Sequence, residues 1–548
     1  MNQYNSPLQS LYNWEDKIPN KIYLQQPING VYHNWTWKEF GDEVRRVASY
    51  IKSLNLPKNT KIAILSKNCA HWIMSDLAIM MSGNISVPLY PNLNSDSLRE
   101  ILDHSESKMI FIGKLDNFED LKVGIPSELI SVAFPKYHSY QNMINWDDII
   151  KENNPILGNP DNDLSDIASI IYTSGTTGSP KGVMHKYFNF AFAIKHAFEV
   201  IDFNQNTRLF SYLPLSHIAE RLLVQMGSIY SGGVVSFAES LDLFKENLIY
   251  AKPTIFLGVP RIWSKFKDGI LVKVNQKKLN LMLSIPFLSS LIKKKIKSQL
   301  GLGFTENTFC GAAAMPVDLL KWFKKLDINI QEAYAMTENC CYSHVTVRDN
   351  IKIGYVGKAL PHCEVKLSDQ KEIMIRHKAL MDGYYKNQEI TNETIIDGWL
   401  CTGDQGEVDS EGFLKITGRI KDLFKTSKGK YVVPSSIEML LSRDSNIDQS
   451  CVVGAGLAQP ILLVVLNESS KNKPANEIKD LLGKSLFKLN SKLNSHERIE
   501  KMIVISEPWT IDNKFLTPTM KLKRNVIENK YKDKYDSWLE KTNQIIFN

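Results

Sequence analysis

The segment 172–183 reads YTSGTTGSPKGV, and its residue types are the ones in the chain most clearly suited to binding or catalysis. It follows the apolar run IASII at 167–171, so a strand should end where the hydroxyl side chains begin. Glycine, serine and threonine together offer backbone N–H groups and hydroxyls, which is how proteins hold phosphate oxygens. A Walker A loop is excluded, because Pro180 stands where that motif needs the glycine before its lysine. Composition alone leaves a phosphate-binding loop and a plain turn as alternatives.

A hydroxyl and a carboxylate stand side by side at Thr337 and Glu338. Oxygen ligands are what Mg²⁺ prefers, and proteins usually share this ion with a bound nucleotide. The structural alternative is a helix start, where Thr337 would cap the first turn.

Three charged residues further along belong to motifs that are described below. The Asp404 carboxylate is an acceptor with two oxygens, and Arg419 is a cation fifteen residues further along the chain. Lys521 offers a point charge on a flexible stem, although the spacing alone does not exclude Lys523. Taken singly, each of these residues is also typical of a solvated surface turn.

These segments belong to a longer series of motifs. In chain order it continues with YLPLSHIAERL (212–222), GAAAMP (311–316), QEAYAMTE (331–338), GWLCTGD (398–404), GRIKD (418–422) and LTPTMKLKR (516–524). Together with YTSGTTGSPKG, the series resembles the adenylate-forming family of acyl-CoA synthetases, nonribosomal adenylation domains and firefly-type luciferases. The wording is closest to that of the long-chain fatty acyl-CoA synthetases. The resemblance covers nearly the whole chain.

The resemblance implies two half-reactions. A fatty acid carboxylate and ATP would give acyl-AMP and pyrophosphate, and the thiol of coenzyme A would then expel AMP. An acyl-AMP ligase that loads a carrier protein is the alternative within enzymes. A catalytically silent nucleotide-binding or membrane-scaffold protein is the alternative from another class, and light-emitting oxidation is a further option. The implied ligands are fatty acid, ATP, CoA and Mg²⁺.

The same resemblance assigns roles to individual residues. Nucleotide binding falls to Thr173, Ser174, Gly175, Thr176, Thr177, Gly178, Lys181, Gly311, Ala314, Tyr334, Asp404 and Arg419. Catalytic roles fall to Lys521, Glu338, Thr337 and His217, and the metal ligands are Thr173 and Glu338. Lys421 takes the hinge position about which the C-terminal domain of relatives rotates.

Two positions depart from the family pattern. Lys428 replaces a small residue in the loop after the hinge, near the expected approach of the thiol. Arg221 falls where some long-chain relatives place an aromatic gate. His217 has a structural alternative as well, a hydrogen-bonded core histidine.

The elements that must position these residues follow from hydrophobic periodicity. From Lys61 onward, short apolar runs such as KIAILS and KMIFIG alternate with stretches of helical spacing such as AHWIMSDLAIMMSG, which indicates parallel sheets covered by helices. From about residue 363 the pattern changes to short strands and turns. We therefore expect an α/β chain with an N-terminal domain at 1–418 that includes a β-rich subdomain. A small α+β domain follows at 419–548 and should end in a Lys-rich helical tail, and the resemblance implies that this domain is mobile.

Length and composition agree with this organisation. The 548 residues are 43% hydrophobic and 23% charged, which suits several packed domains and excludes disorder and collagen-like repeats. The apolar stretch 281–292 is too short and too interrupted to span a bilayer. No secretory signal is readable, and the seven cysteines are expected as reduced thiols without a metal site. We expect a cytoplasmic protein without a nucleic-acid partner.

The net charge of +7 is unevenly placed. Residues 265–297 hold nine lysines and one aspartate around the apolar stretch. Three interpretations stay open: a solvated helix face, lysines that attract a polyphosphate ligand, and peripheral contact with the inner face of an anionic membrane. Homodimer formation is open as well.

Overall fold

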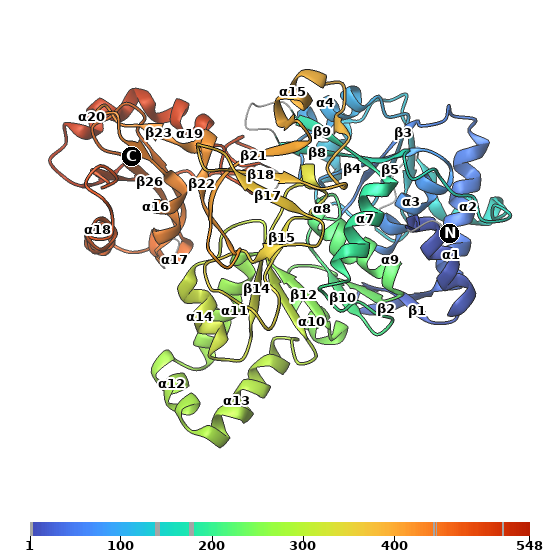
Figure 1. The fold of residues 1–548 in the computed structure, drawn as a ribbon, viewed down its shortest axis with the longest axis horizontal. Helices are drawn as coiled ribbons and strands as arrows, with labels where there is room; N and C mark the ends of the chain where they lie inside the picture. Colours follow the sequence, from blue (N-terminus) through green and yellow to red (C-terminus); the bar gives the residue numbers. More distant parts are fainter. Residues whose placement is uncertain (1–3, 138–142, 175–179, 442–443, 445, 518–519) are drawn as a thin grey trace. The chain divides into compact units, whose positions relative to one another are not determined.

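A computed structural model describes residues 4–137, 143–174, 180–441, 444, 446–517 and 520–548 (Figure 1). The chain divides into two compact units. Of the described residues, 4–137, 143–174, 180–365 and 375–400 belong to unit 1, and those within 366–374 and 401–548 belong to unit 2.

An eight-stranded sheet forms one half of unit 1, in the order β19-β9-β8-β4-β3-β5-β6-β7. The strands β3 to β8 pair in parallel, whereas β9 pairs antiparallel with both β8 and β19. Their bounds are Lys61–Leu65 (β3), Ile85–Leu89 (β4), Met109–Ile112 (β5), Ile130–Ala133 (β6), Ile144–Asn145 (β7), Ile167–Ser174 (β8), Pro180–Lys186 (β9) and Gly383–Tyr384 (β19). The central strands are apolar throughout because helices cover both faces of such a sheet.

Those covering helices include α3, whose twelve residues Ala70–Met81 are all buried. Its sequence is mostly apolar on all sides, which is typical of a helix that packs on more than one side. The other helices of this half are α1 (Pro7–Lys17), α2 (Trp37–Ser53), α4 (Ser95–Ser105), α5 (Phe118–Leu121), α6 (Trp146–Glu152) and α7 (Tyr187–Ala197).

A nine-stranded sheet forms the other half of unit 1, in the order β16-β15-β14-β13-β12-β10-β11-β1-β2. The neighbours from β14 to β1 run parallel. The bounds are Ile22–Ile28 (β1), Val31–Thr36 (β2), Arg208–Ser211 (β10), Val234–Phe237 (β11), Ile255–Gly258 (β12), Asn307–Cys310 (β13), Ile330–Tyr334 (β14), His344–Val345 (β15) and Lys358–Ala359 (β16).

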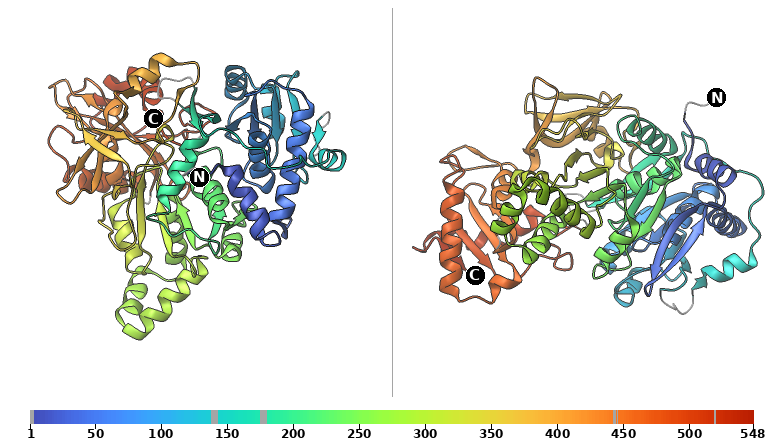
Figure 2. Two further views of the ribbon diagram at one scale, coloured as in Figure 1. Left: turned by 45° about the vertical axis from the view of Figure 1, so that its right-hand side comes forward. Right: turned by 90° about the horizontal axis from the view of Figure 1, so that it is seen from below.

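The helices of this half are short except for those that follow β12. The short helices are α8 (Ile218–Glu220), a π-helical segment (Arg221–Met226), α9 (Gly227–Ser231), α10 (Phe244–Ala251), α14 (Val317–Lys324) and a 3₁₀ turn (Thr337–Asn339). After β12 come α11 (Pro260–Lys273), α12 (Gln276–Ser284) and α13 (Pro286–Gln299), and the last two form a hairpin that projects from the sheet (Figures 1 and 2).

The β-rich segment expected from residue 363 is a five-stranded sheet, β17-β18-β21-β20, with β22 on β21. Its elements are β17 (Glu364–Leu367), β18 (Glu372–Arg376), α15 (Gln388–Thr394), β20 (Ile395–Ile396), β21 (Trp399–Val408) and β22 (Leu414–Arg419). The division between the two units passes through this sheet.

The rest of unit 2 is an α+β fold built on a four-stranded sheet, β25-β26-β27-β28. Its elements are a 3₁₀ turn (Ile420–Asp422), β23 (Phe424–Lys425), β24 (Tyr431–Val432), α16 (Pro434–Leu441), β25 (Ile447–Val453), β26 (Ile461–Leu466), α17 (Glu468–Lys471), α18 (Ala475–Asn490), β27 (Lys501–Ile505), α19 (Arg524–Tyr531), α20 (Tyr535–Leu539) and β28 (Ile545–Phe547). The expected α/β architecture is confirmed. The helical tail is corrected, because α20 is followed by β28, which pairs in parallel with β27.

Candidate active site

The ends of parallel strands β13 and β14 bring two of the predicted motifs together in unit 1. Cys310 pairs with Glu332 in the register of the two strands, so Gly311 and Tyr334 leave the sheet at the same edge. A Cβ atom added to Gly311 would lie 3.7 Å from the carbonyl oxygen of Ala333, an ordinary contact. The carboxyl edge of a parallel sheet is where α/β proteins usually bind ligands.

Glu332 fastens the segment Gly311–Ala314 to β14. Its carboxylate accepts the backbone N–H groups of Met315 and Gly354. Burial raises the pKa of Glu332 to about 7, and these two hydrogen bonds act in the opposite direction. These bonds hold the chain that follows β13 next to β14. No sequence motif identified Glu332.

Glu338 is oriented by a tyrosine from the other sheet of unit 1. The hydroxyl of Tyr384 donates a hydrogen bond of 2.8 Å to Glu338 Oε1. Tyr384 pairs with Val183 of β9, and Lys181 of the same strand places its Nζ 5.3 Å from the centroid of the Tyr384 ring. Burial, with Glu338 as a second cause, raises the pKa of Tyr384, so the phenol keeps its proton and can donate it. No sequence motif identified Tyr384.

His185 ties the Thr337–Asn339 turn to β9. Its Nε2 donates to the carbonyl oxygen of Thr337 at 2.9 Å. Burial lowers the pKa of His185 to about 3, so the ring is neutral at physiological pH. The backbone of Thr337 is thus held by His185, and the side chain of the next residue, Glu338, is held by Tyr384.

The phosphate-loop prediction falls partly outside the described residues. Thr173, at the end of β8, is half-buried and pairs with Lys181 across the β8–β9 ladder. The backbone of Ser174 belongs to β8. Gly175, Thr176, Thr177 and Gly178 lie outside the described residues. Lys181 of β9, which follows the loop, lies near Tyr384, and Tyr384 donates to Glu338. The loop therefore begins and ends on strands that lie near Glu338.

His217 begins α8 just after β10. Its Nδ1 accepts the backbone N–H of Ala219 at 3.2 Å, and the ring is half-buried. Glu220 of the same helix is buried and accepts hydrogen bonds from the Ser211 hydroxyl at 2.9 Å and from the Tyr212 N–H at 3.0 Å. Burial raises the pKa of Glu220 to about 8. Glu220 thereby fixes the turn that leads to His217.

Arg221 is part of a buried ionic network. Its Nη2 donates to Asp76 Oδ1 at 2.6 Å, and both side chains are fully buried. Nη1 donates to the Ser169 hydroxyl at 2.6 Å, and Gln225 donates to the other oxygen of Asp76 at 2.6 Å. The network joins α3, β8 and the π-helical segment, so Arg221 has a structural role at the position of the family's aromatic gate.

In unit 2, Asp404 and Arg419 form a cross-strand pair. They face each other in the register of β21 and β22, and Arg419 Nε donates to Asp404 Oδ1 at 2.8 Å. The structure thus brings together two residues that the family resemblance had assigned to nucleotide binding.

Lys521 and Arg524 are close in the sequence but differ in their surroundings. Lys521 is exposed, and its N–H donates to the Thr517 hydroxyl at 3.0 Å in a loop that Leu516 and Leu522 close by pairing. Arg524 donates to Glu438 at 2.6 Å and to the carbonyl oxygen of Val452 at 2.6 Å, which makes it a structural residue.

The residue predicted as the hinge and the loop that follows it are exposed in unit 2. Lys421 stands in the 3₁₀ turn Ile420–Asp422, and Lys428 precedes Gly429 in the turn between β23 and β24. Gly429 has φ 72°, a conformation that glycine adopts easily.

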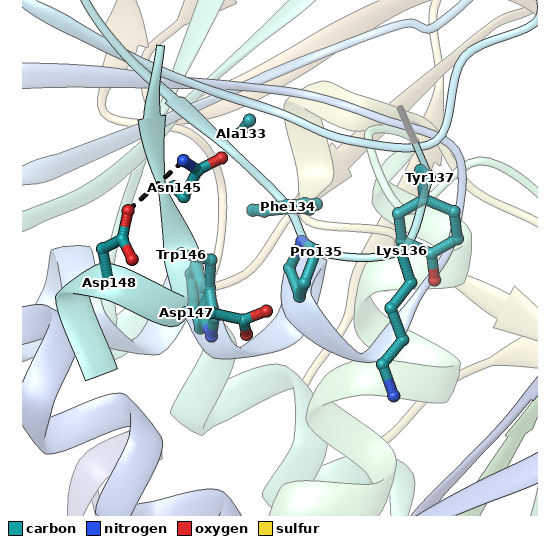
Figure 3. Close-up of a pocket in the computed structure, with 9 residues that line it drawn as sticks. All are labelled: Ala133, Phe134, Pro135, Lys136, Tyr137, Asn145, Trp146, Asp147 and Asp148. Carbon is teal, nitrogen blue, oxygen red and sulfur yellow. Dashed lines mark hydrogen bonds between the residues drawn. The ribbon is translucent and has the colours of Figure 1, made fainter. Parts of the chain in front are cut away.

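A pocket of about 470 Å³ opens elsewhere in unit 1, between β6 and α6 (Figure 3). Figure 3 shows Asn145 at its wall donating to Asp148, over 3.3 Å. None of the predicted site residues lines this pocket, so it does not bear on their assignment.

Comparisons with known proteins match nearly the full chain. The model described as "AMP-binding enzyme" matches residues 12–385, and "AMP-binding enzyme C-terminal domain" matches 421–543. The chain is 29% identical to Long chain acyl-CoA synthetase 2 of Arabidopsis thaliana, over 96% of this chain and 91% of that protein. It is 26% identical to Long-chain-fatty-acid–CoA ligase FadD15 of Mycobacterium bovis, over 95% of each.

The fold is also that of a solved relative. The anthranilate CoA ligase AuaEII, in complex with anthranoyl-AMP, matches with a TM-score of 0.78 at 20% identity, covering 97% of this chain and 98% of the other. Among the described residues, no helix combines the length and the apolar character needed to cross a membrane. The motifs, the fold and the two family matches agree, and the chain belongs to the AMP-binding enzyme family.

Proposed function

We propose that this enzyme activates a long-chain fatty acid as acyl-AMP and transfers the acyl group to coenzyme A. The observation that carries the proposal is the contact of Tyr384 with Glu338 next to Lys181, because it places an oriented carboxylate and an ammonium beside the strands of the phosphate loop. The names of the two relatives support the acyl chain class and the acceptor.

The first half-reaction joins two anions, so positive charge must be supplied where negative charge accumulates. Thr173 and Glu338 offer a hydroxyl and a carboxylate, the hard oxygen donors that suit Mg²⁺, and Tyr384 fixes one oxygen of the carboxylate. When bound, Mg²⁺ would neutralise phosphate charge. Lys181 adds its ammonium group on the same strand ladder as Thr173.

The remaining nucleotide contacts follow the motif assignments. Gly311–Ala314 and Tyr334 would enclose the adenine at the carboxyl edge of β13 and β14. Asp404 would accept the ribose hydroxyls, with Arg419 donating to its Oδ1 and holding it in place.

The two half-reactions take place at the same acyl carbon but need different neighbouring groups. We assign Lys521 to the adenylation step and His217 to the region of the reacting carboxylate. Rotation at Lys421 would replace Lys521 by a surface that admits the thiol. The domain boundary near residue 418 is part of this proposal.

The assay that tests the proposal supplies purified enzyme with ATP, Mg²⁺ and fatty acids from short to long chain, with and without CoA. Pyrophosphate and thioester are both measured. We expect pyrophosphate release with long-chain acids and thioester only when CoA is present. Pyrophosphate without thioester, restored by a carrier protein, would indicate a carrier-loading ligase. Release of neither product with any acid would contradict the proposal as a whole.

A further inference from the structure

One side of the α12–α13 hairpin packs against the rest of unit 1. Leu279 and Ser289 are buried. Leu283 and Ile296 pack against the core cluster that contains Phe256 and Trp263. The hairpin is therefore attached to unit 1 by its inner side, and its other residues are available for another role.

Large apolar side chains are exposed around the connection between the two helices. Leu281 is 65% exposed, Ile285 47%, Phe287 79% and Leu291 52%. Phe287 and Leu291 are four residues apart on α13 and thus share one face of that helix. Single exposed apolar residues are common, but a group of four on a projecting element marks a surface that contacts something apolar.

Lysines lie one helical turn behind this apolar group on both helices. Lys277 and Lys278 precede Leu281 by four and three residues, and Lys294 and Lys295 follow Leu291 by three and four. All four lysines are exposed, and none of them has an ion pair with the described residues. No acidic residue occurs between 269 and 305. Each of the two helices therefore carries apolar side chains near the connection between them and lysines about one helical turn further from it.

We propose that the α12–α13 hairpin docks on the surface of an anionic lipid bilayer. At 1.5 Å per helical residue, Lys277 and Lys294 lie roughly 12 Å from Ile285 along their helices. This spacing matches insertion of apolar residues by about 5–10 Å into the interface, which leaves the lysines at the level of the lipid phosphates. A polyphosphate or nucleic acid would use the lysines but not the four apolar side chains, and an apolar protein surface would not use the lysines.

This inference goes beyond the proposed function and is tested without substrate. The full-length enzyme is floated with vesicles of phosphatidylcholine alone and of phosphatidylcholine mixed with phosphatidylglycerol, at low and high salt. We expect binding to the mixed vesicles that weakens at high salt, and little binding to phosphatidylcholine alone.

Two sets of substitutions separate the apolar and basic contributions. Phe287→Ser with Leu291→Ser should weaken binding to mixed vesicles by at least about tenfold, because two apolar side chains no longer leave water. Replacing Lys277, Lys278, Lys294 and Lys295 by Gln should abolish the preference for anionic lipid and the salt dependence.

Helix α18 offers a matched control. Phe487 is also 79% exposed and is flanked by the exposed residues Lys484 and Lys488. Phe487→Ser with Lys484→Gln and Lys488→Gln should leave vesicle binding unchanged. Thermal unfolding of every variant verifies that the fold is intact.

Three results would overturn the proposal. One is absence of wild-type binding to mixed vesicles. Another is loss of binding in the α18 variant but not in the hairpin variants. The third is sensitivity to the lysine substitutions only, which would make the hairpin an anion-binding surface. Pyrophosphate release with a water-soluble shorter acid should not change in any hairpin variant, so failure of the docking proposal is distinguishable from failure of the ligase proposal.

Discussion

Tyr384 and Glu338 are 46 residues apart in the sequence and are joined by a hydrogen bond of 2.8 Å from the phenol to Oε1 of the carboxylate. The bond connects the antiparallel edge of the eight-stranded sheet to the turn that follows β14 of the nine-stranded sheet. The orientation of the proposed metal ligand thus depends on both sheets of unit 1.

Replacing Tyr384 by Phe tests this positioning role. The ring and its contact with Lys181 remain, but one oxygen of Glu338 loses its donor. We expect adenylation to fall by about 10- to 100-fold, as is usual when a partner of a metal ligand is removed, with a higher requirement for Mg²⁺. Pyrophosphate release is measured across a Mg²⁺ titration.

Tyr385→Phe is the matched control for this experiment. The hydroxyl of Tyr385 donates to the exposed Glu106 at 3.0 Å and not to a proposed site residue. Its activity should equal that of the wild type. Equal Mg²⁺ dependence in the Tyr384 and Tyr385 variants would contradict the role given to Tyr384.

Lys521→Ala should depress adenylation far more than thioester formation from supplied acyl-AMP. Removing a charged contact to developing negative charge typically lowers the rate by about 100-fold or more. The two half-reactions are assayed separately, and Lys523→Ala serves as control. Equal losses in both half-reactions would argue against alternation of the domain, and a larger effect of Lys523 would reassign the residue.

The buried pair Arg221–Asp76 predicts a large effect on stability. Arg221→Met leaves the Asp76 carboxylate buried without its ionic partner, which costs about 3–5 kcal/mol in free energy of unfolding. Adding Asp76→Leu should recover much of this loss. Urea unfolding measures both variants.

An exposed ion pair provides the comparison. Arg376 and Glu364 form an ion pair at the surface, so Arg376→Met should change the free energy of unfolding by less than about 1 kcal/mol. A similar loss for Arg221→Met and Arg376→Met would show that burial of the first pair does not determine its contribution.

Glu220 predicts a specific dependence of stability on pH. Its pKa is raised from 4.5 to about 8 by burial, so the folded protein binds more protons than the unfolded chain between these values. The contribution of Glu220 to stability is therefore complete below the unfolded pKa and is lost as pH rises toward 8. Glu220→Gln removes this titration.

The measurement is urea unfolding of the wild type and Glu220→Gln from pH 5 to about pH 8. The difference in free energy of unfolding between the two proteins at each pH isolates the contribution of Glu220. Other groups act in the opposite direction in both proteins, such as His185, whose lowered pKa makes stability rise with pH. We expect the Gln variant to gain stability relative to the wild type as pH rises. A difference that is constant with pH would refute this assignment.

Local sequence patterns predicted the strands and helices well. The runs KIAILS and KMIFIG contain β3 and β5, and the stretch AHWIMSDLAIMMSG contains α3, because periodicity and burial are properties of a short segment. The ends of β13 and β14 meet as parallel pairing requires, which explains why the GAAAMP and QEAYAMTE motifs could be placed together.

Long-range partners could not be predicted in this way. Tyr384 contacts Glu338, and Asp76 contacts Arg221 from 145 residues away, but neither tyrosine nor aspartate carries a local signal for such a partner. Arg524 resembles solvated basic surface in the sequence, yet it is buried against Glu438. The final strand β28 follows a Lys-rich region whose pattern favoured helix.

Arg524 has a mechanical consequence for unit 2. Its guanidinium bonds to α16 and to β25, and it lies 4.0 Å from Asp422 in the turn that contains Lys421. Lys521 stands three residues before this anchor. If the domain rotates about that turn as proposed, the contacts of Arg524 would make α16, β25 and the start of α19 move together, and Lys521 would be displaced with them.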